Sequence, residues 1–379
     1  FNNININRIM LEIMDKPIPN NFLNDLEPYK GGARSVNGIE KIFKLSSNEN
    51  PFGPSDSVVN AYNDAISDIT IYPDPSNKLL VSKLSEFYSI NPNNIICGCG
   101  SDEILHLLAR AYLSGNDEAI VSENSFAVYP LAIKASGARI VRAKELNFQA
   151  QTEAILGLIN NSTKMIFIAN PNNPTGTMIS YEDLKNLHKK LPPNILLVID
   201  EAYIEYVNDN NYSSFISLVE NNNNIVVTRT FSKAYGLAGL RVGWAYCPSE
   251  VINVLGRLRI PFSVNSTAQK VAVAAIDDQK HILKSIDHNN LWLPKITEEL
   301  ENIGFQTIPS SCNFVLFEVS EKLSFDANYV FDFLCSRGLI LRQMHEYNLP
   351  NFLRLTIGND EANNLLIESL KELPKKYEK

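Results

Sequence analysis

The stretch that decides the fold is Thr228-Arg-Thr-Phe-Ser-Lys-Ala-Tyr-Gly-Leu-Ala-Gly-Leu-Arg-Val-Gly-Trp244. An apolar run at 225–227 leads into it and is typical of a buried strand. Lys233 follows that run among hydroxyl side chains, and Arg241 stands eight residues further on. Because lysine is rarely buried without a partner, a lysine at the end of a buried strand indicates a Schiff-base nucleophile.

The bulk composition is that of an ordinary globular protein with a sizeable core. The chain has 379 residues, of which 45% are hydrophobic and 20% are charged, and this length predicts two domains or one large domain with an appendage. The net charge of −8 argues against binding to nucleic acid. It does not argue against a small anionic substrate, because local arginines decide that.

The cysteines and the N-terminal stretch exclude other classes of protein. The five cysteines are odd in number and include no Cys-x-x-Cys pair, so we expect neither a metal site nor a disulfide framework. A reducing cytoplasm is the compartment that this pattern favours. The apolar stretch 9–14 is interrupted by Glu12 and is too short to span a membrane.

Short apolar runs alternate with helical patterns between residues 94 and 247, which is typical of an α/β domain with a buried, mostly parallel sheet. We expect seven strands, at 94–97, 118–122, 138–142, 165–169, 195–199, 225–228 and 243–247. The large domain is predicted to span 45–262. A smaller α+β domain is predicted from 1–44 together with 263–379, with helices at 266–300, 327–337 and 360–373 and strands at 314–319, 339–342 and 353–357.

Polar residues at the ends of the predicted strands are candidate ligand contacts, because open α/β sheets bind ligands beyond the carboxyl ends of their strands. The string 98–103 places glycines, Ser101 and Asp102 at the start of a predicted helix. Exposed backbone N–H groups and the positive end of the helix dipole can bind an anion there. The alternative is an ordinary helix cap. The loop 170–176 holds two prolines and a glycine that fix its shape and aim Asn173; the alternative is a plain turn.

Two further strand ends carry groups that suit a charged aromatic cofactor. Asp200 follows four aliphatic residues and must find a cation or strong donors, so it can pair with a pyridinium or form a structural salt bridge. Tyr203 stands close enough to reach an oxygen on the same ring. Hydroxyls at Thr230 and Ser232 and the guanidinium of Arg241 suit a phosphate. Together with Lys233 these groups predict a pyridoxal 5'-phosphate site, whereas Lys233 alone could be a surface lysine in a glycine-rich loop.

Several of these strings resemble a known family. The segments 170–176, 200–203 and 232–241 resemble the class I and II aminotransferases of pyridoxal-phosphate fold type I. The segments 46–54, 72–74, 100–103 and 349–358 resemble the histidinol-phosphate aminotransferases within it. The similarity runs from about Leu26 to Leu370.

The resemblance implies a role for each matching position in the cofactor site. Lys233 would form the Schiff base and move the substrate proton, and Asp200 would pair with the ring nitrogen. Tyr203 and Asn173 would bind the ring oxygen, and Phe126 would stack on the ring. The cofactor phosphate would be bound by Ser101, Asp102, Thr230, Ser232 and Arg241. Tyr72 would reach that phosphate from a neighbouring subunit, which implies a homodimer with shared sites.

The resemblance also implies a substrate site. Arg354 would bind the α-carboxylate of glutamate or 2-oxoglutarate, and Tyr29 and Arg342 would hold the phosphate of the amino donor. Asn48 is expected in the same site. From the sequence alone, Arg342 could instead be a surface ion pair and Tyr29 an ordinary packing residue.

The activity that the resemblance implies is amino-group transfer from L-histidinol phosphate to 2-oxoglutarate, giving imidazole acetol phosphate and glutamate in histidine biosynthesis. An aromatic aminotransferase or a threonine-phosphate decarboxylase on the same scaffold remains open. A pyridoxal-phosphate-binding regulator is disfavoured, because no stretch before residue 26 is long enough for a DNA-binding domain and the net charge is negative.

Overall fold

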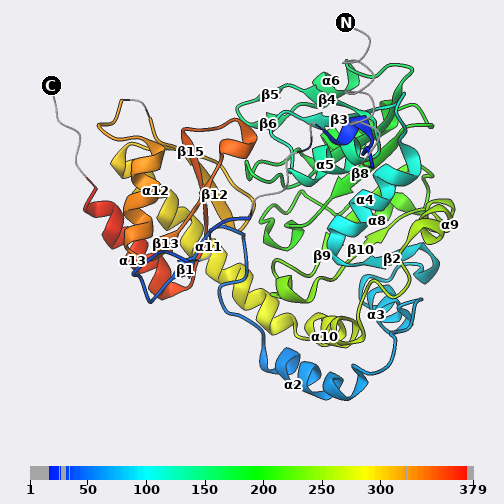
Figure 1. The fold of residues 1–379 in the computed structure, drawn as a ribbon, viewed down its shortest axis with the longest axis horizontal. Coiled ribbons are helices and arrows are strands. Elements are labelled where there is room, and N and C mark those ends of the chain that lie inside the picture. Colours follow the sequence, from blue (N-terminus) through cyan, green and yellow to red (C-terminus); the bar gives the residue numbers. More distant parts are fainter. Residues whose placement is uncertain (1–16, 25, 27–30, 34, 321, 374–379) are drawn as a thin grey trace, which may run out of the picture.

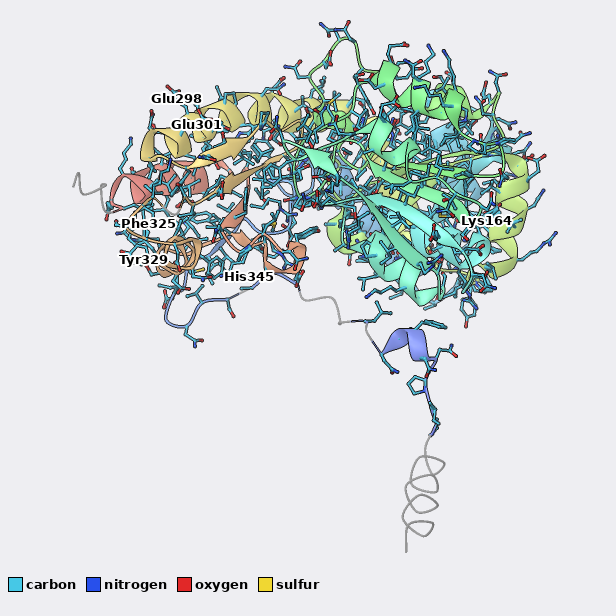
Figure 2. All side chains as sticks on the ribbon, turned by 90° about the horizontal axis from the view of Figure 1, so that it is seen from above. Lys164, Glu298, Glu301, Phe325, Tyr329 and His345 are labelled. Carbon is cyan, nitrogen blue, oxygen red and sulfur yellow. The ribbon has the colours of Figure 1, made fainter. Side chains whose placement is uncertain are left out.

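The computed structural model describes residues 17–24, 26, 31–33, 35–320 and 322–373. Figure 1 shows two unequal bodies, the larger built on a seven-stranded sheet and the smaller on a four-stranded sheet. The long helix α11 (Gln279–Ile303) runs from the smaller body toward α10 (Ser266–Asp277) in the larger one. Figure 2 gives the same picture from above, with Lys164 in the larger body and Phe325 and Tyr329 at the opposite end.

The seven-stranded sheet confirms the predicted α/β fold. All its neighbouring strands are parallel except β10, which is antiparallel to both of its neighbours. The strand order is β2 (Ile95–Gly98), β10 (Gly243–Tyr246), β9 (Ile225–Thr230), β8 (Leu196–Asp200), β7 (Thr163–Ala169), β3 (Glu118–Ser122) and β4 (Arg139–Ala143). The predicted strands match these segments because central strands buried on both faces consist of continuous apolar runs.

Successive side chains of a central strand enter two separate cores, so helices cover both faces of the sheet. Leu197 and Ile199 of β8 pack with α3, α7 and α10, whereas Leu196 and Val198 pack with α4, α5 and α9. These helices are α3 (Lys78–Tyr88), α4 (Gly100–Tyr112), α5 (Val128–Ala135), α7 (Tyr181–Lys190) and α9 (Ser249–Leu258). Shorter helices are α2 (Asp56–Asp64), α6 (Thr152–Leu156) and α8 (Ile216–Val219).

The smaller body has the mixed character that the sequence predicts. Its antiparallel sheet runs β11 (Gln306–Ile308), β12 (Phe314–Glu318), β15 (Phe352–Thr356) and β14 (Arg342–Gln343). Helices α11, α12 (Ala327–Ser336) and α13 (Asp360–Lys371) pack around this sheet. The short strand β1 (Phe43–Lys44) pairs with β13 (Leu339–Ile340).

Short elements complete the described chain. The hairpin β5–β6 (Glu145–Leu146 and Gln149–Ala150) extends from β4. The 3-10 helices are η1 (Asn21–Leu23), η2 (Ala65–Asp68), η3 (Pro92–Asn94), η4 (Ile204–Tyr206), η5 (Ala238–Leu240) and η6 (His345–Tyr347). Helix η1 contacts α5 of the larger body, while β1 belongs to the smaller one. The domain boundaries at 44/45 and 262/263 stay a prediction.

The helical segment predicted at 266–300 is two helices, not one. Asp278 has φ −90° and ψ 61°, which takes it out of the helix between α10 and α11. Its carboxylate accepts a hydrogen bond from the backbone N–H of His281 at 3.2 Å. An aspartate that caps a helix in this way competes with helix continuation, and this is the physical reason for the break.

Across the described ranges, none of the helices combines the length and the apolar character that crossing a lipid bilayer requires.

Candidate active site

The predicted cofactor residues, Tyr72 excepted, meet at one cavity at the carboxyl ends of β7, β8 and β9. Its volume is about 460 Å³. Of the residues predicted for the site, the cavity is lined by Asn48, Ser101, Asp102, Phe126, Asn173, Asp200, Tyr203, Thr230, Ser232, Lys233, Arg241, Arg342 and Arg354. The fold brings together side chains more than 300 positions apart in the sequence, such as Asn48 and Arg354 of β15.

Lys233 follows β9 and points its amine across the cavity. Its Nζ donates a hydrogen bond to the backbone carbonyl of Ser47 at 3.0 Å and lies 5.6 Å from the centre of the Tyr203 ring. Burial, reinforced by the positive charge of Arg354, lowers the pKa of Lys233 to about 8. A substantial fraction of this amine is therefore uncharged near neutral pH, as a nucleophile or a base requires.

Asp200 is the last residue of β8 and is 3% exposed. Its Oδ2 accepts a hydrogen bond from the Tyr129 hydroxyl at 2.9 Å. Its Oδ1 is buried and has no hydrogen-bond partner among the residues that the structure describes. Burial raises the pKa of Asp200 to about 6. A buried carboxylate oxygen without a partner fits a protonated ring nitrogen as its missing donor.

The hydroxyl of Tyr203 is free to donate its proton to an acceptor in the cavity. Its oxygen accepts hydrogen bonds from the side-chain amides of Asn48 at 2.8 Å and Asn173 at 3.3 Å. Because both of these partners donate, the hydroxyl proton is left for a further acceptor. Burial raises the pKa of Tyr203, so the group stays a neutral donor. A phenolate oxygen on a cofactor ring is such an acceptor.

The loop that carries Asn173 is held rigidly, as its prolines and glycine predict. The side chain of Asn170 accepts from the backbone N–H of Ile179 at 2.7 Å and donates to the backbone carbonyl of Ile179 at 2.9 Å. Gly176 has φ +81°, and a Cβ there would stand 2.4 Å from the hydroxyl oxygen of Ser310. Glycine is therefore required at this turn.

The N-terminus of α4 and the turn after β9 form a cradle for an anion. The helix begins at Gly100, which leaves the backbone N–H groups of Ser101 and Asp102 in its first turn. Arg241 lies beside it, with Nη2 3.1 Å from Asp102 Oδ2 and Nη1 3.5 Å from Ser232 Oγ. This is the arrangement that a bound phosphate needs: helix amides, hydroxyls and one guanidinium.

Close backbone packing holds this cradle in place. Gly100 has φ +76°, and a Cβ at this position would stand 2.6 Å from Arg241 Nη2. Arg241 itself has φ +54°, a left-handed conformation that is rare for residues with a side chain. Such strain is typical of functional positions that the surrounding structure fixes. The geometry thus fits the sequence prediction for the phosphate-binding residues.

Two arginines of the smaller body line the same cavity from neighbouring strands. Arg342 on β14 and Arg354 on β15 are directly paired in the strand register. Arg354 is 6% exposed; its Nη2 donates to the backbone carbonyl of Ser46 at 2.7 Å, and its Nη1 donates to Asn173 Oδ1. Arg342 forms an ion pair with Glu346 at 2.7 Å. Both guanidinium groups are placed to bind anionic parts of a substrate.

Two of the predicted residues are not part of this cavity as described. Tyr29 lies outside the described residues. Tyr72 is 80% exposed and stacks on Phe262, with ring centres 4.7 Å apart, at a separate surface hollow. Its predicted position in the site of a neighbouring subunit stays a prediction.

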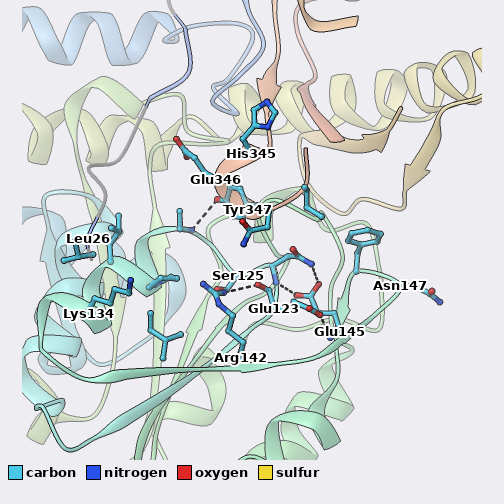
Figure 3. A pocket seen from close by; sticks show the side chains of 18 residues that line it. Leu26, Glu123, Ser125, Lys134, Arg142, Glu145, Asn147, His345, Glu346 and Tyr347 are labelled. Atoms are coloured by element: carbon cyan, nitrogen blue, oxygen red, sulfur yellow. Dashed lines mark hydrogen bonds between the residues drawn. The ribbon is translucent and has the colours of Figure 1, made fainter. Parts of the chain in front are cut away.

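A second, larger cavity of about 1140 Å³ adjoins the first (Figure 3). Tyr347 lines both cavities, and its hydroxyl accepts a hydrogen bond from the backbone N–H of Ala127 at 3.3 Å. Charged residues of both signs line this second cavity: Glu123, Lys134, Arg142, Glu145 and Glu346. The sequence analysis did not predict this cavity, because it forms between segments near residues 123–149 and 345–349 that carry no shared motif.

Tyr129 is the contact of the cofactor site that the sequence analysis missed. It stands three residues after Phe126, and its ring meets the Phe126 ring edge-on with centres 5.7 Å apart and planes at 87°. Residues three apart on a helical pattern face the same side, so the spacing could have placed Tyr129 beside Phe126 but could not have shown its hydrogen bond to Asp200. Ser47 was missed as well, because a backbone carbonyl leaves no signal in the sequence.

Comparison with known proteins identifies relatives along almost the whole chain. The family model for aminotransferase class I and II matches residues 40–370. A histidinol-phosphate aminotransferase of Rhodopseudomonas palustris is 45% identical over 360 residues, covering 95% of this chain and 99% of that protein. A histidinol-phosphate aminotransferase of Nitrobacter hamburgensis is 43% identical over 360 residues, with the same coverage.

Solved structures agree with this similarity. The histidinol-phosphate aminotransferase of Sinorhizobium meliloti, in complex with pyridoxal-5'-phosphate, aligns with a TM-score of 0.82 at 27% identity, covering 88% of this chain and 92% of that chain. An aspartate aminotransferase of Thermus thermophilus aligns with a TM-score of 0.77 at 22% identity, covering 90% of this chain and 98% of that chain. The overall fold is therefore pyridoxal-phosphate fold type I, as predicted.

Proposed function

Because the chain belongs to the class I and II aminotransferase family, we propose that it transfers the amino group of L-histidinol phosphate to 2-oxoglutarate, with pyridoxal 5'-phosphate as cofactor. The products are imidazole acetol phosphate and glutamate, in a step of histidine biosynthesis. One observation carries the proposal: Lys233, Tyr203 and the unpaired Oδ1 of Asp200 meet in one cavity of a chain 45% identical to a histidinol-phosphate aminotransferase.

The residues around the cavity suit each part of the cofactor. Asp200 Oδ1 would accept the ring N–H, the Tyr203 hydroxyl would donate to the ring oxygen, and Phe126 would stack on the ring face. The N-terminus of α4 and Arg241 would hold the cofactor phosphate. When bound, pyridoxal phosphate supplies the carbonyl that takes up the amino group and the ring that delocalises the electron pair left on the substrate.

Lys233 Nζ moves the proton. Its pKa of about 8 lies near the working pH of a cell, which is where a general base is most effective. It takes the proton from Cα of the amino donor and returns a proton when the keto acid is aminated. The neighbouring carbonyl of Ser47 holds the amine in position for both transfers.

The paired arginines bind the substrates. We assign Arg354 to the α-carboxylate of glutamate or 2-oxoglutarate and Arg342, with Tyr29, to the phosphate of the amino donor. The Arg342–Glu346 ion pair has to open, or accept a third charge, when a phosphate arrives. Asn48 holds Tyr203 through its amide and is itself fixed by Thr356, so its contribution to the substrate site includes this positioning role.

The proposal includes a homodimer, in which Tyr72 of the partner subunit reaches the cofactor phosphate. An exposed apolar surface supports it, because large patches of this kind mark interfaces. Its residues are Val59, Tyr62, Ile66, Ile69, Ile71, Tyr72, Leu79, Ile260 and Phe262. Residues 69–73 and 261–267 line one surface hollow, so the two parts of this patch are adjacent. The cytoplasmic location stays a prediction from the cysteines, all five of which are free thiols.

Replacing the proposed nucleophile tests the reaction type. In Lys233→Ala we expect loss of the visible absorbance of the bound cofactor and loss of amino transfer, since the other lysine lining this cavity, Lys44, is ion-paired with Glu49 and bonded to Ser47 Oγ. The measurement is an absorbance spectrum together with an assay on histidinol phosphate and 2-oxoglutarate. Lys164→Ala is the control, because Lys164 lies near the start of β7, opposite the strand ends at the site. Full activity in Lys233→Ala would contradict the proposed role of Lys233 as nucleophile and base.

Replacing Arg342 tests the amino donor. A charge-assisted contact to a phosphate contributes roughly 2–4 kcal/mol, so Arg342→Ala should lower kcat/KM for histidinol phosphate by about two orders of magnitude. The control is Arg337→Ala, which removes an arginine that pairs with Glu372 away from the cavity. Phenylalanine and threonine phosphate are assayed beside histidinol phosphate. An aromatic aminotransferase would keep its activity in Arg342→Ala, and a decarboxylase would release carbon dioxide from threonine phosphate.

A further inference from the structure

The buried Tyr129 contacts two of the proposed cofactor residues, Asp200 and Phe126, without lining the cavity itself. Tyr129 of α5 is fully buried. Its hydroxyl donates to Asp200 Oδ2 at 2.9 Å, and its ring meets the edge of Phe126. On its other side the ring is stacked on Phe167, with centres 5.2 Å apart and planes at 17°. Tyr129 therefore connects the carboxylate at the ring nitrogen with the aromatic side chain at the ring face.

The hydrogen bond determines which oxygen of Asp200 can serve a ligand. Oδ2 is occupied by Tyr129, and Oδ1 has no partner among the described residues. Since the Tyr129 ring is held between Phe126 and Phe167, its hydroxyl has a fixed position. The carboxylate is consequently held in one orientation, with Oδ1 as the oxygen open to a new donor.

The same bond favours the ionised form of Asp200. Burial raises the pKa of this carboxyl. The Tyr129 hydroxyl lowers it most, the Thr228 side chain and the backbone N–H of Ala202 lower it further, and the negative charge of Asp102 on α4 raises it. Thr228, its cross-strand neighbour on β9, and Tyr203, three residues on, are the other polar side chains facing it. Tyr129 remains a neutral donor, because burial and the Asp200 charge raise its own pKa. The ionised carboxylate is the form that makes a charge-assisted hydrogen bond to the ring N–H of a pyridinium and so favours the protonated ring.

We propose that Tyr129 is a positioning residue for the cofactor: its hydroxyl keeps Asp200 ionised and oriented toward the ring nitrogen, and its ring supports Phe126 at the ring face. This inference rests on the proposed function, because it presumes that a pyridinium is the ligand of Asp200. Tyr129 touches neither the substrate nor the reacting carbon, so its effect reaches the reaction only through Asp200 and Phe126.

The test compares cofactor binding in the wild-type protein and in Tyr129→Phe, which removes one hydroxyl and keeps the ring. We expect roughly ten- to hundredfold weaker binding of pyridoxal phosphate at neutral pH, the range for loss of a hydrogen bond to a charged group. Because the Asp200 pKa rises in the variant, the pH below which binding is lost should move upward by about one unit. We expect kcat to fall while KM for histidinol phosphate stays within about twofold.

Tyr246→Phe is the matched control. Tyr246 on β10 is also fully buried in the large sheet, and its hydroxyl donates to a carboxylate, Glu220, at 3.1 Å. The substitution therefore removes a buried tyrosine hydroxyl that donates to a carboxylate, here an exposed one, and that also accepts from the backbone N–H of Asn91, without touching Asp200. Cofactor affinity and its pH midpoint should match the wild type in this control, whereas both should change in Tyr129→Phe.

A double-mutant cycle with Asp200→Asn isolates the route of the effect. If Tyr129 acts through the carboxylate, Tyr129→Phe should weaken cofactor binding far less in the Asp200→Asn background than in the wild type. Equal losses in both backgrounds, or wild-type affinity and pH midpoint in Tyr129→Phe, would overturn the inference. A wild-type protein that binds no pyridoxal phosphate would instead overturn the proposed function, so the two failures can be told apart.

Discussion

The environment of the Lys233 amine sets the pH at which it reacts. Burial and the charge of Arg354 lower its pKa to about 8, whereas a free lysine titrates near 10.4. The nucleophile is the uncharged amine, which is the minor form below pH 8 and the major form above it. In the cofactor-free protein, the rate of covalent cofactor capture should therefore rise about tenfold per pH unit and level off near pH 8.

Stopped-flow absorbance after mixing cofactor-free protein with pyridoxal phosphate measures this rate across pH. A small-molecule amine with the ordinary lysine pKa, run in parallel, should keep accelerating up to about pH 10. A protein profile that follows the free amine would show that the buried position of Lys233 does not tune its reactivity.

The residues that could be predicted from the sequence share one property. Lys233, Asp200 and Asn173 follow buried apolar runs, and a polar side chain at the carboxyl end of such a strand has few structural explanations. Tyr129 could not be told from a packing residue, because a tyrosine in an amphipathic helix is an ordinary core side chain. The contact of Arg354 with Asn173 depended on how the two sheets meet, which local patterns do not specify.

At the scale of elements, the position of α4 depends on a single glycine of β10. A Cβ on Gly243 would stand 2.4 Å from the backbone nitrogen of Ser101 and 2.7 Å from the carbonyl carbon of Gly100. Gly243→Ala should push the first turn of α4 away from the sheet. We expect a loss of about 1–3 kcal/mol of stability from overpacking, and weaker cofactor binding because the helix amides are displaced.

Thermal unfolding with and without cofactor measures both effects. Gly256→Ala is the control, because Gly256 lies in α9 with no atom within 4 Å of the added Cβ. Alanine there should leave Tm unchanged or raise it, since alanine favours the helix. If Gly243→Ala binds the cofactor as tightly as wild type, the close packing of β10 against α4 is not what positions the phosphate cradle.

Prediction of elements succeeded where the signal is long and periodic. The seven central strands are apolar runs, and they coincide with the predicted segments to within a few residues. The interruption at Asp278 was missed because the helical pattern continues on both sides of it. The pairing of β1 with β13 was missed because two-residue strands carry no periodicity, so only tertiary contacts specify them.

At the scale of the whole molecule, the exposed apolar patch tests the proposed assembly. Ile71 is 70% exposed within it and adjoins Tyr72. Ile71→Asp should weaken the dimer, since a carboxylate would be buried without a partner at the interface. Activity should fall with the dimer, because each site would lose Tyr72 of the partner subunit.

Sedimentation velocity over a range of protein concentrations measures the assembly. Leu146→Asp is the control, because Leu146 is 62% exposed on the β5–β6 hairpin, outside the patch. A wild-type protein that stays monomeric at high concentration, or an Ile71→Asp variant with wild-type self-association, would contradict the proposed interface.

The pairing of Arg342 with Arg354 on adjacent strands of the smaller body has an evolutionary consequence. The groups proposed to carry out the chemistry lie almost entirely in the larger body, whereas the two arginines proposed to bind the substrates lie on β14 and β15. Substitutions in these two strands can therefore alter the amino donor while leaving the catalytic apparatus intact. This division of labour makes β14 the natural starting point for redesigning the specificity of this protein.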